Sequence, residues 1–155
     1  MRLGLISDTH GLVRPEALAA LAGSSLIVHA GDIGNAAVLD ALGAIAPVYA
    51  VRGNIDRGEW ARSLPATEVV EIGSRSVYVL HEIGTLDLDP AAAGFSVVVY
   101  GHSHRPEARR RGDVLYINPG SAGPRRFSLP VAVARLSIDD ERLDYELLEL
   151  PVGGT

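Results

Sequence analysis

The amino-acid sequence predicts an α/β fold in which mixed β-sheets pack as a sandwich. Short apolar runs recur along the chain and each ends in polar, glycine-rich residues, a pattern typical of β-strands. Helix-like segments separate the first three runs, whereas the connections after residue 65 are shorter. The predicted strands span residues 2–7, 25–30, 47–51, 68–72, 76–80, 95–100, 114–117, 131–138 and 142–150.

The first half of the chain should form parallel strands. One helix is predicted over residues 14–23, because Pro15 stands near its start and Gly23 at its end, and another over residues 35–45. Strands that alternate with helices in this way indicate right-handed crossovers between parallel neighbours. We therefore expect the first three strands to run parallel within one sheet.

The second half should contain mixed or antiparallel pairing. The stretch EVVEIGSRSVYVL predicts a hairpin that turns at Gly73 and Ser74. The chain has 155 residues, of which 47% are hydrophobic, and this supplies enough apolar material for a substantial core. Without an internal repeat or a linker, we expect a single domain over residues 1–155, with 151–155 as a loose tail.

The composition excludes several classes of protein. A net charge of −5 argues against broad nucleic-acid binding through a basic face. Because the chain has no cysteine, a metal site would consist of histidine, carboxylate and amide groups, which favours manganese, iron, zinc, nickel or magnesium. The first apolar run ends too soon for a signal peptide, and no run is long enough for a membrane helix. We therefore expect a cytoplasmic protein without a membrane partner.

Polar side chains with metal-binding capacity follow several predicted strands. In open α/β sheets, ligands bind outside the carboxyl ends of the strands. Each residue alone has an ordinary explanation as a helix cap, a turn residue or a structural histidine, but their joint placement does not. His29 lies inside its strand and is predicted to be a packed residue. The residues at strand ends are Asp8, His10, Asp32, Asn54, Asp56, His81, His102 and His104.

The stretch YGHSHRP sets His102 and His104 one residue apart. On a regular strand the two side chains would share a face, whereas in a tight loop opened by Gly101 both imidazoles can converge on one point. Neutral imidazole is the commonest protein ligand for transition metals, so convergence predicts a metal ion with further ligands from other loops.

The ordered motifs D-x-H, GD, GN-x-D, H and GHSH, followed by NPGS at 118–121, carry a family resemblance. They resemble the calcineurin-like metallophosphoesterase superfamily, and most closely its small bacterial and archaeal phosphodiesterase branch. The resemblance implies a four-layer αββα sandwich of mixed sheets with two divalent metal ions. One ion would be held by Asp8, His10 and His104, the other by Asn54, His81 and His102, and Asp32 would bridge them.

The implied activity is hydrolysis of phosphate esters. A hydroxide that bridges the two ions would attack phosphorus, and the same seven residues would carry catalysis. Manganese is the metal expected first, and the substrate is expected to be a small or nucleotide-like phosphodiester. Two alternatives stay open: a phosphomonoesterase, and a scaffold or binding module, since the fold also serves in a membrane-trafficking coat. Homo-oligomerisation is also left open.

Residues around the implied ligands have weaker expectations. Asp56 would orient a ligand imidazole by accepting its other ring N–H, or it is simply a turn residue. Asn118 would hold the loop beside the site, or NPGS is a purely structural turn. Arg105 would meet a substrate phosphate, whereas the arginine run at 109–111 is expected at a solvated surface or hairpin tip. Two departures from the family pattern stand out. Ile55 replaces the acid histidine of protein phosphatases, and Glu82 replaces a common glycine, where it could crowd the site, bind metal or point away.

Overall fold

The computed structural model describes residues 1–152, which form two five-stranded sheets. In the first sheet the strand order is β10-β9-β1-β2-β3. Its strands β1, β2 and β3 run parallel, as predicted, and β9 pairs antiparallel with both β1 and β10. The strands are β1 (Arg2–Ile6), β2 (Leu26–His29), β3 (Val48–Ala50), β9 (Ala132–Ile138) and β10 (Leu143–Glu149), and the crossover helices are α1 (Pro15–Leu21) and α2 (Ala36–Gly43).

The second sheet has the order β4-β5-β6-β8-β7 and contains both parallel and antiparallel pairs. Its strands are β4 (Thr67–Ile72), β5 (Arg75–Leu80), β6 (Val97–Val99), β7 (Glu107–Arg111) and β8 (Val114–Asn118). The hairpin between β4 and β5 turns at Gly73 and Ser74, as predicted.

The edge strand β7 was not predicted. Its sequence EARRR lacks the apolar alternation that marks a half-buried strand, because every residue of this edge strand except Ala108 is exposed. The arginine run at 109–111 is exposed, as expected, but it lies within β7 and not at a hairpin tip.

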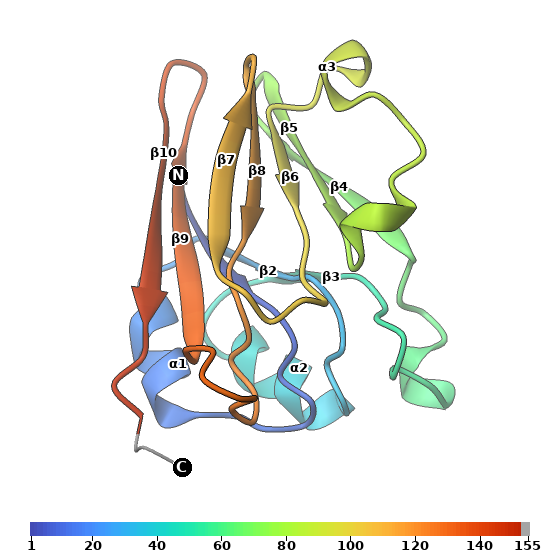
Figure 1. The fold of residues 1–155 in the computed structure, drawn as a ribbon, viewed down its shortest axis with the longest axis vertical. Helices are drawn as coiled ribbons and strands as arrows, with labels where there is room; N and C mark the ends of the chain where they lie inside the picture. The colour runs from blue at the N-terminus through green and yellow to red at the C-terminus, as the bar shows by residue number, and fades with distance from the viewer. Residues whose placement is uncertain (153–155) are drawn as a thin grey trace.

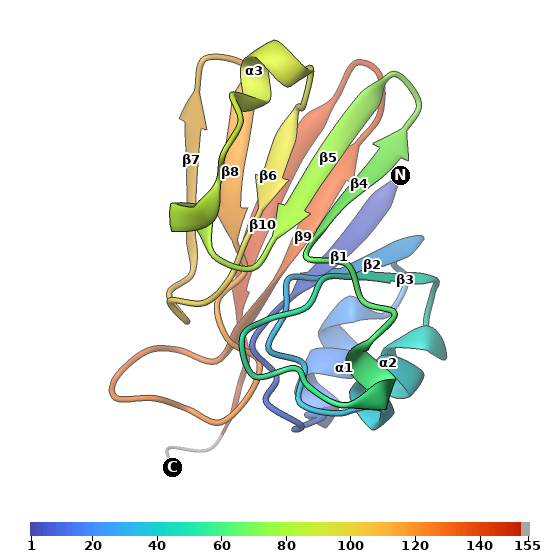
Figure 2. The same ribbon diagram turned by 90° about the vertical axis from the view of Figure 1, so that its right-hand side faces the viewer.

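The main core lies between the two sheets. Leu3 and Leu5 of β1 and Val28 of β2 share one buried cluster with valines from β5 and β6, among them Val77 and Val97. A second cluster lies between the first sheet and the helices, where Leu21 of α1 packs with Val38 and Leu42 of α2. Figures 1 and 2 show α1 and α2 gathered at the end of the molecule opposite α3.

The outer face of the second sheet is covered by a thin layer. The segment that contains the short helices η2 (Ile83–Thr85) and α3 (Pro90–Ala93) places Ile83, Leu86 and Phe95 over Tyr78 and Tyr100. The four-layer αββα sandwich is therefore confirmed, with its fourth layer reduced to this segment. A further short helix, η1 (Glu59–Ala61), follows β3.

The expected loose tail is only partly described. Val152 packs against the cluster beneath the helices, and its N–H donates to the carbonyl of Leu150 at 2.8 Å, so residues 151 and 152 are held. Residues 153–155 lie outside the described residues. Within residues 1–152, no helix has the length and apolar character required to cross a bilayer.

Candidate metal centre

Loops from both sheets meet at the carboxyl ends of the strands. The N–H of Asp8 donates to the carbonyl of Gly31 and that of His10 to the carbonyl of Asp32, at 3.0 and 2.9 Å, which extends the pairing of β1 and β2 beyond the strands. Between the sheets, the N–H of His102 donates to Oδ2 of Asp8 at 3.0 Å. The aspartates of the first sheet therefore face the histidines of the second.

Two clusters of potential ligands form where these loops meet. Each offers ligand atoms that all lie within 4.8 Å of one another. The ring centroids of His10 and His104 are 5.2 Å apart, as are those of His81 and His102, so the neighbours His102 and His104 serve different clusters. The clusters are Asp8, His10 and His104, and Asp32, His81 and His102.

Asp32, a member of the second cluster, also lies close to the first. Its Oδ2 is 3.7 Å from Nε2 of His10 and 3.3 Å from Nε2 of His81. Oδ1 of Asp8 lies 3.4 Å from Nε2 of His104 and 4.0 Å from that of His81. Two ligands of one ion, each about 2.1 Å from it, lie roughly 3 to 3.5 Å apart. The separations of His81 and His104 from the nearest aspartate fall within this range.

Several polar atoms of the clusters are buried and have no hydrogen-bond partner among the described residues. Such orphaned atoms cost about 1–3 kcal/mol each, and more when charged, so native proteins contain few of them. The four atoms are Asp8 Oδ1, His10 Nε2, His81 Nε2 and His104 Nδ1. Three of them face one small region, since Oδ1 of Asp8 lies 3.9 Å from Nε2 of His10 and 4.0 Å from Nε2 of His81, and this fits a site for divalent cations.

Burial and neighbouring charges act in opposite directions on these groups. Burial raises the pKa of Asp8 above its usual value. Burial alone would raise the pKa of Asp32 too, but His81 and the N–H of Ile55 lower it to about 2. Burial lowers the pKa of His104, whereas in His81 the contacts with Asp32 and the carbonyl of Ala30 outweigh burial and raise the pKa. Asp32 is therefore a carboxylate at neutral pH.

Buried His29 ties two of the loops together. Its Nδ1 accepts from the N–H of Gly31 at 3.1 Å, so Nε2 carries the proton and donates to Thr9 Oγ1 at 3.0 Å. Thr9 in turn donates to the carbonyl of Ile33 at 2.8 Å. Burial lowers the pKa of His29 to about 3, so the ring is neutral. The prediction of a packed histidine is confirmed, and the chain of hydrogen bonds places Asp8 and His10 relative to Asp32.

Most candidate ligands have a strained backbone. Left-handed φ values are uncommon for non-glycine residues and concentrate at functional sites. Close approach also requires Gly53 and Gly101, because a Cβ at either position would collide with Asp32 or with Ser7 and Asp8. Among residues 1–152, the non-glycine residues with such values are Asp8 (55°), His10 (47°), Asp32 (55°), His102 (72°), His104 (63°) and Phe127 (52°).

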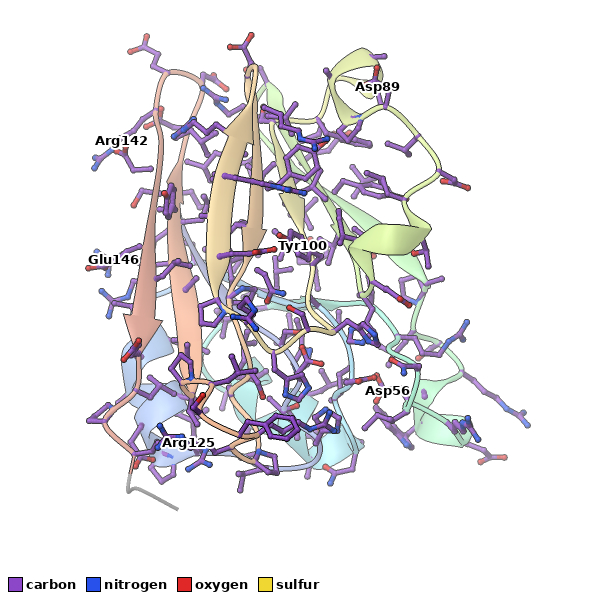
Figure 3. The ribbon with its side chains drawn as sticks, in the orientation of Figure 1. Asp56, Asp89, Tyr100, Arg125, Arg142 and Glu146 are labelled. Atoms are coloured by element: carbon purple, nitrogen blue, oxygen red, sulfur yellow. The ribbon has the colours of Figure 1, made fainter. Side chains whose placement is uncertain are left out.

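The Asp56 carboxylate fits the second of its two expected roles, as a turn residue that holds the loops, better than the first. Its oxygens accept from the backbone N–H groups of Ile33, Gly34 and Gly53 at 2.9–3.2 Å, and the second ring nitrogen of His81 instead faces the carbonyl of Ala30 at 2.7 Å. Asp56 therefore joins the loops after β2 and β3 and does not orient that imidazole. Figure 3 labels it on the loop that follows β3.

The remaining predicted residues lie around the clusters. Asn118 donates to the carbonyl of Gly101 and to Ser103 Oγ, both at 3.1 Å, so it holds the histidine loop. Asn54 is exposed and borders a cavity together with His81, and Arg105 is also exposed.

Three further residues lie beside the clusters, and of these Ser7 was not singled out from the sequence. Ser7 Oγ donates to Asp8 Oδ2 at 2.7 Å, and its place directly before Asp8 was the only signal for it. Arg126, on the loop between β8 and β9, lies near enough to His104 to lower its pKa, after the larger effect of burial. Glu82 Oε1 is 3.7 Å from Nε2 of His102, so this carboxylate faces the centre and does not point away.

The comparison with a family model decides the identity. Residues 1–141 match the calcineurin-like phosphoesterase superfamily domain. The chain belongs to this superfamily. The "Probable metallophosphoesterase" of Methanothermobacter thermautotrophicus is 36% identical, over 96% of this chain and 92% of that protein. Phosphodiesterase YfcE of Escherichia coli strain K12 is 30% identical, over 90% of this chain and 89% of the YfcE chain.

A solved structure supports the fold alone. Vps29 of Entamoeba histolytica, complexed with Zn²⁺, is 22% identical and superposes with a TM-score of 0.77 over 94% of this chain and 90% of that one. Membership in the superfamily implies divalent metal ions. The buried ligand atoms without hydrogen-bond partners in this chain fit a site for such ions.

Proposed function

We propose that this protein is a metal-dependent phosphodiesterase that holds two divalent ions, with manganese the metal expected first. One ion would be held by Asp8, His10 and His104, and the other by Asn54, His81 and His102. Asp32 would be shared, since its Oδ2 lies within 3.7 Å of a histidine from each group. The observation that carries the proposal is the set of buried, unpartnered ligand atoms around Asp8, whose Oδ1 lies within 4.0 Å of Nε2 of His10 and of His81.

The protein's residues supply the charge balance and the rigidity of this site. When bound, divalent ions provide a nucleophile at neutral pH and neutralise charge on the phosphoryl oxygens. Asp8 and Asp32 are the only carboxylates in the proposed ligand set, and the histidines and Asn54 are neutral ligands. The loaded centre therefore keeps a positive charge that attracts an anionic ester. The hydrogen bonds from Ser7 and from the N–H of His102 fix Asp8 in its orientation.

A diester is favoured over the alternatives by two observations. Ile55 takes the position where a histidine would protonate a poor leaving group, and its alkyl side chain has no proton to donate, which disfavours monoesters with poor leaving groups. The similarity to a protein named phosphodiesterase also supports this substrate class. A scaffold role is less well supported, because every proposed ligand position holds a residue able to bind metal. A small or nucleotide-like diester is the proposed substrate class.

Metal removal and restoration test the proposal. Protein stripped with a chelator should not hydrolyse bis(p-nitrophenyl) phosphate, and added manganese should restore activity with about two ions per chain. Asp32→Ala should bind less metal and lose activity. Asp144→Ala, which removes an exposed carboxylate from β10, should retain both. Full hydrolysis by the stripped protein, or unchanged metal content in Asp32→Ala, would contradict the proposal.

A further inference from the structure

A cavity of about 300 Å³ opens directly beside the candidate centre. Asn54 and His81 form its inner border, and Tyr78 and Leu80 of β5 contribute its apolar side. Its size is at the lower end of the range for small-molecule sites. A molecule held between the metal ligands could therefore extend one group into this space.

The outer walls of the cavity carry opposite charges. Arg52 lies on one wall, and two exposed carboxylates, Glu82 and Asp87, also line the cavity. The backbone of Glu82 is fixed, because its carbonyl accepts from both the N–H and the Oγ1 of Thr85, at 3.0 and 2.7 Å. Its carboxylate, 3.7 Å from His102, lies where the cavity meets the centre.

We propose that this cavity receives one alcohol group of a phosphodiester, and that Glu82 selects against esters with a second negative charge. The inference rests on the proposed function and adds a substrate class to it. The alcohol group would carry hydroxyl or ammonium groups and no further phosphate, because the two carboxylates outnumber Arg52.

The physical basis is charge repulsion at the phosphoryl group. A phosphodiester carries one negative charge, whereas a monoester is largely dianionic at neutral pH and is repelled about twice as strongly by Glu82. One extra charge at ~7 Å changes an equilibrium by about 3-fold in the dielectric of water and by about 50-fold in that of a protein surface. Glu82 is half exposed, so the lower part of this range applies.

Glu82→Gln tests the charge while it keeps the shape of the side chain. Activity is measured at saturating manganese with p-nitrophenyl phosphate and p-nitrophenyl methyl phosphate, which share one leaving group. The variant should shift the ratio of kcat/KM toward the monoester by about 3-fold or more. Glu146→Gln is the control, since it removes the same charge from β10 on the side of the molecule opposite Asp56 (Figure 3). An equal ratio in wild type and Glu82→Gln would overturn the inference.

Ala66→Trp tests the cavity itself. Ala66 is an exposed residue on the cavity wall, so a larger side chain there should fill the space without disturbing the core. With p-nitrophenyl alkyl phosphates of increasing alkyl size, the variant should lose kcat/KM progressively, whereas the methyl ester should be little affected. A uniform loss for all esters, or no loss, would overturn the inference.

A binding measurement separates failure of this inference from failure of the proposed function. Calorimetry with manganese-loaded protein compares phenyl phosphate with its methyl ester, whether or not either is hydrolysed. Absence of hydrolysis would refute the proposed function, while a shift of the affinity ratio toward the monoester in Glu82→Gln would still support the inference. An unchanged ratio in Glu82→Gln, or no binding of either compound, would overturn it.

Discussion

The hydrogen bonds of His29 should stabilise the loops that present the candidate ligands. His29→Leu removes both ring nitrogens and nearly keeps the side-chain volume. The N–H of Gly31 then loses its acceptor, and Thr9 loses one of its two partners but still donates to Ile33. The substitution therefore tests the hydrogen bonds with little change in packing.

The expected cost follows from these contacts. A buried N–H without a partner costs about 1–3 kcal/mol, and loss of the second bond costs about 0.5–1.5 kcal/mol. Because His29 is fully buried, water cannot replace it. We expect His29→Leu to lower the free energy of unfolding of the metal-free protein by about 2–4 kcal/mol.

Urea unfolding of a double-mutant cycle measures this effect. Thr9→Val removes the other partner of the same hydrogen bond, so the double variant should be less destabilised than the sum of the single variants by about 1 kcal/mol. The manganese affinity of these variants should also fall, by about 10- to 100-fold, because the hydrogen bond at Thr9 holds the backbone between the candidate ligands Asp8 and His10. A cost below about 0.5 kcal/mol for His29→Leu, or strict additivity of the two single substitutions, would refute the proposed stabilisation by the hydrogen bonds of His29.

Further predictions concern pH, metal ligands and the leaving group. The folded-state pKa of His29 is lowered from 6.5 to about 3, so its contribution to stability is present above pH 6.5 and lost as pH falls toward 3. Between pH 6.5 and 5, urea unfolding of metal-free wild type should show a loss of unfolding free energy that is about 1.5 kcal/mol larger than in His29→Leu. Equal losses in the two proteins would contradict this. His102→Ala and His104→Ala should each retain a different ion in crystals soaked with manganese, and loss of the same ion in both would refute the proposed division. Without an acid at Ile55, rates for aryl and alkyl diesters should depend steeply on leaving-group pKa, and Ile55→His should flatten this slope; a shallow slope in the wild type would mean that another residue supplies the proton.

The elements that were predicted from the sequence are those with strong local signals. The strands β1, β2 and β3 have continuous apolar runs, and the polar residues that follow them come together because parallel strands end at the same edge of a sheet. The two histidines of YGHSHRP could likewise be expected to converge. The structure adds that both have left-handed φ values, which direct their rings to different clusters.

What the sequence did not reveal depends on contacts between distant segments. The strand β7 forms because β8 offers an edge, although its own sequence is polar. The role of Asp56 depends on amides 22 and 23 residues away, from a loop that only the fold brings near. The orientation of Glu82 toward His102 similarly depends on how two loops of the second sheet meet. Local patterns carry no information about such pairings.

The strained backbone at His102 leads to a prediction in which the usual order of two substitutions is reversed. Its φ of 72° costs a residue with a Cβ about 1–2 kcal/mol, whereas glycine adopts this value freely. Glycine loses more conformational entropy on folding, about 0.5–1 kcal/mol, so a net advantage of roughly 0.5–1 kcal/mol over alanine remains. In metal-free protein His102→Gly should therefore be more stable than His102→Ala, although both lack the imidazole. At Asp40, an exposed position inside α2, the alanine variant should instead be more stable than the glycine variant by about 1 kcal/mol. Urea unfolding of the four variants provides the comparison. If alanine were the more stable residue at both positions, strain at His102 would be refuted, and with it the argument that the loop is held in this conformation to present its side chain.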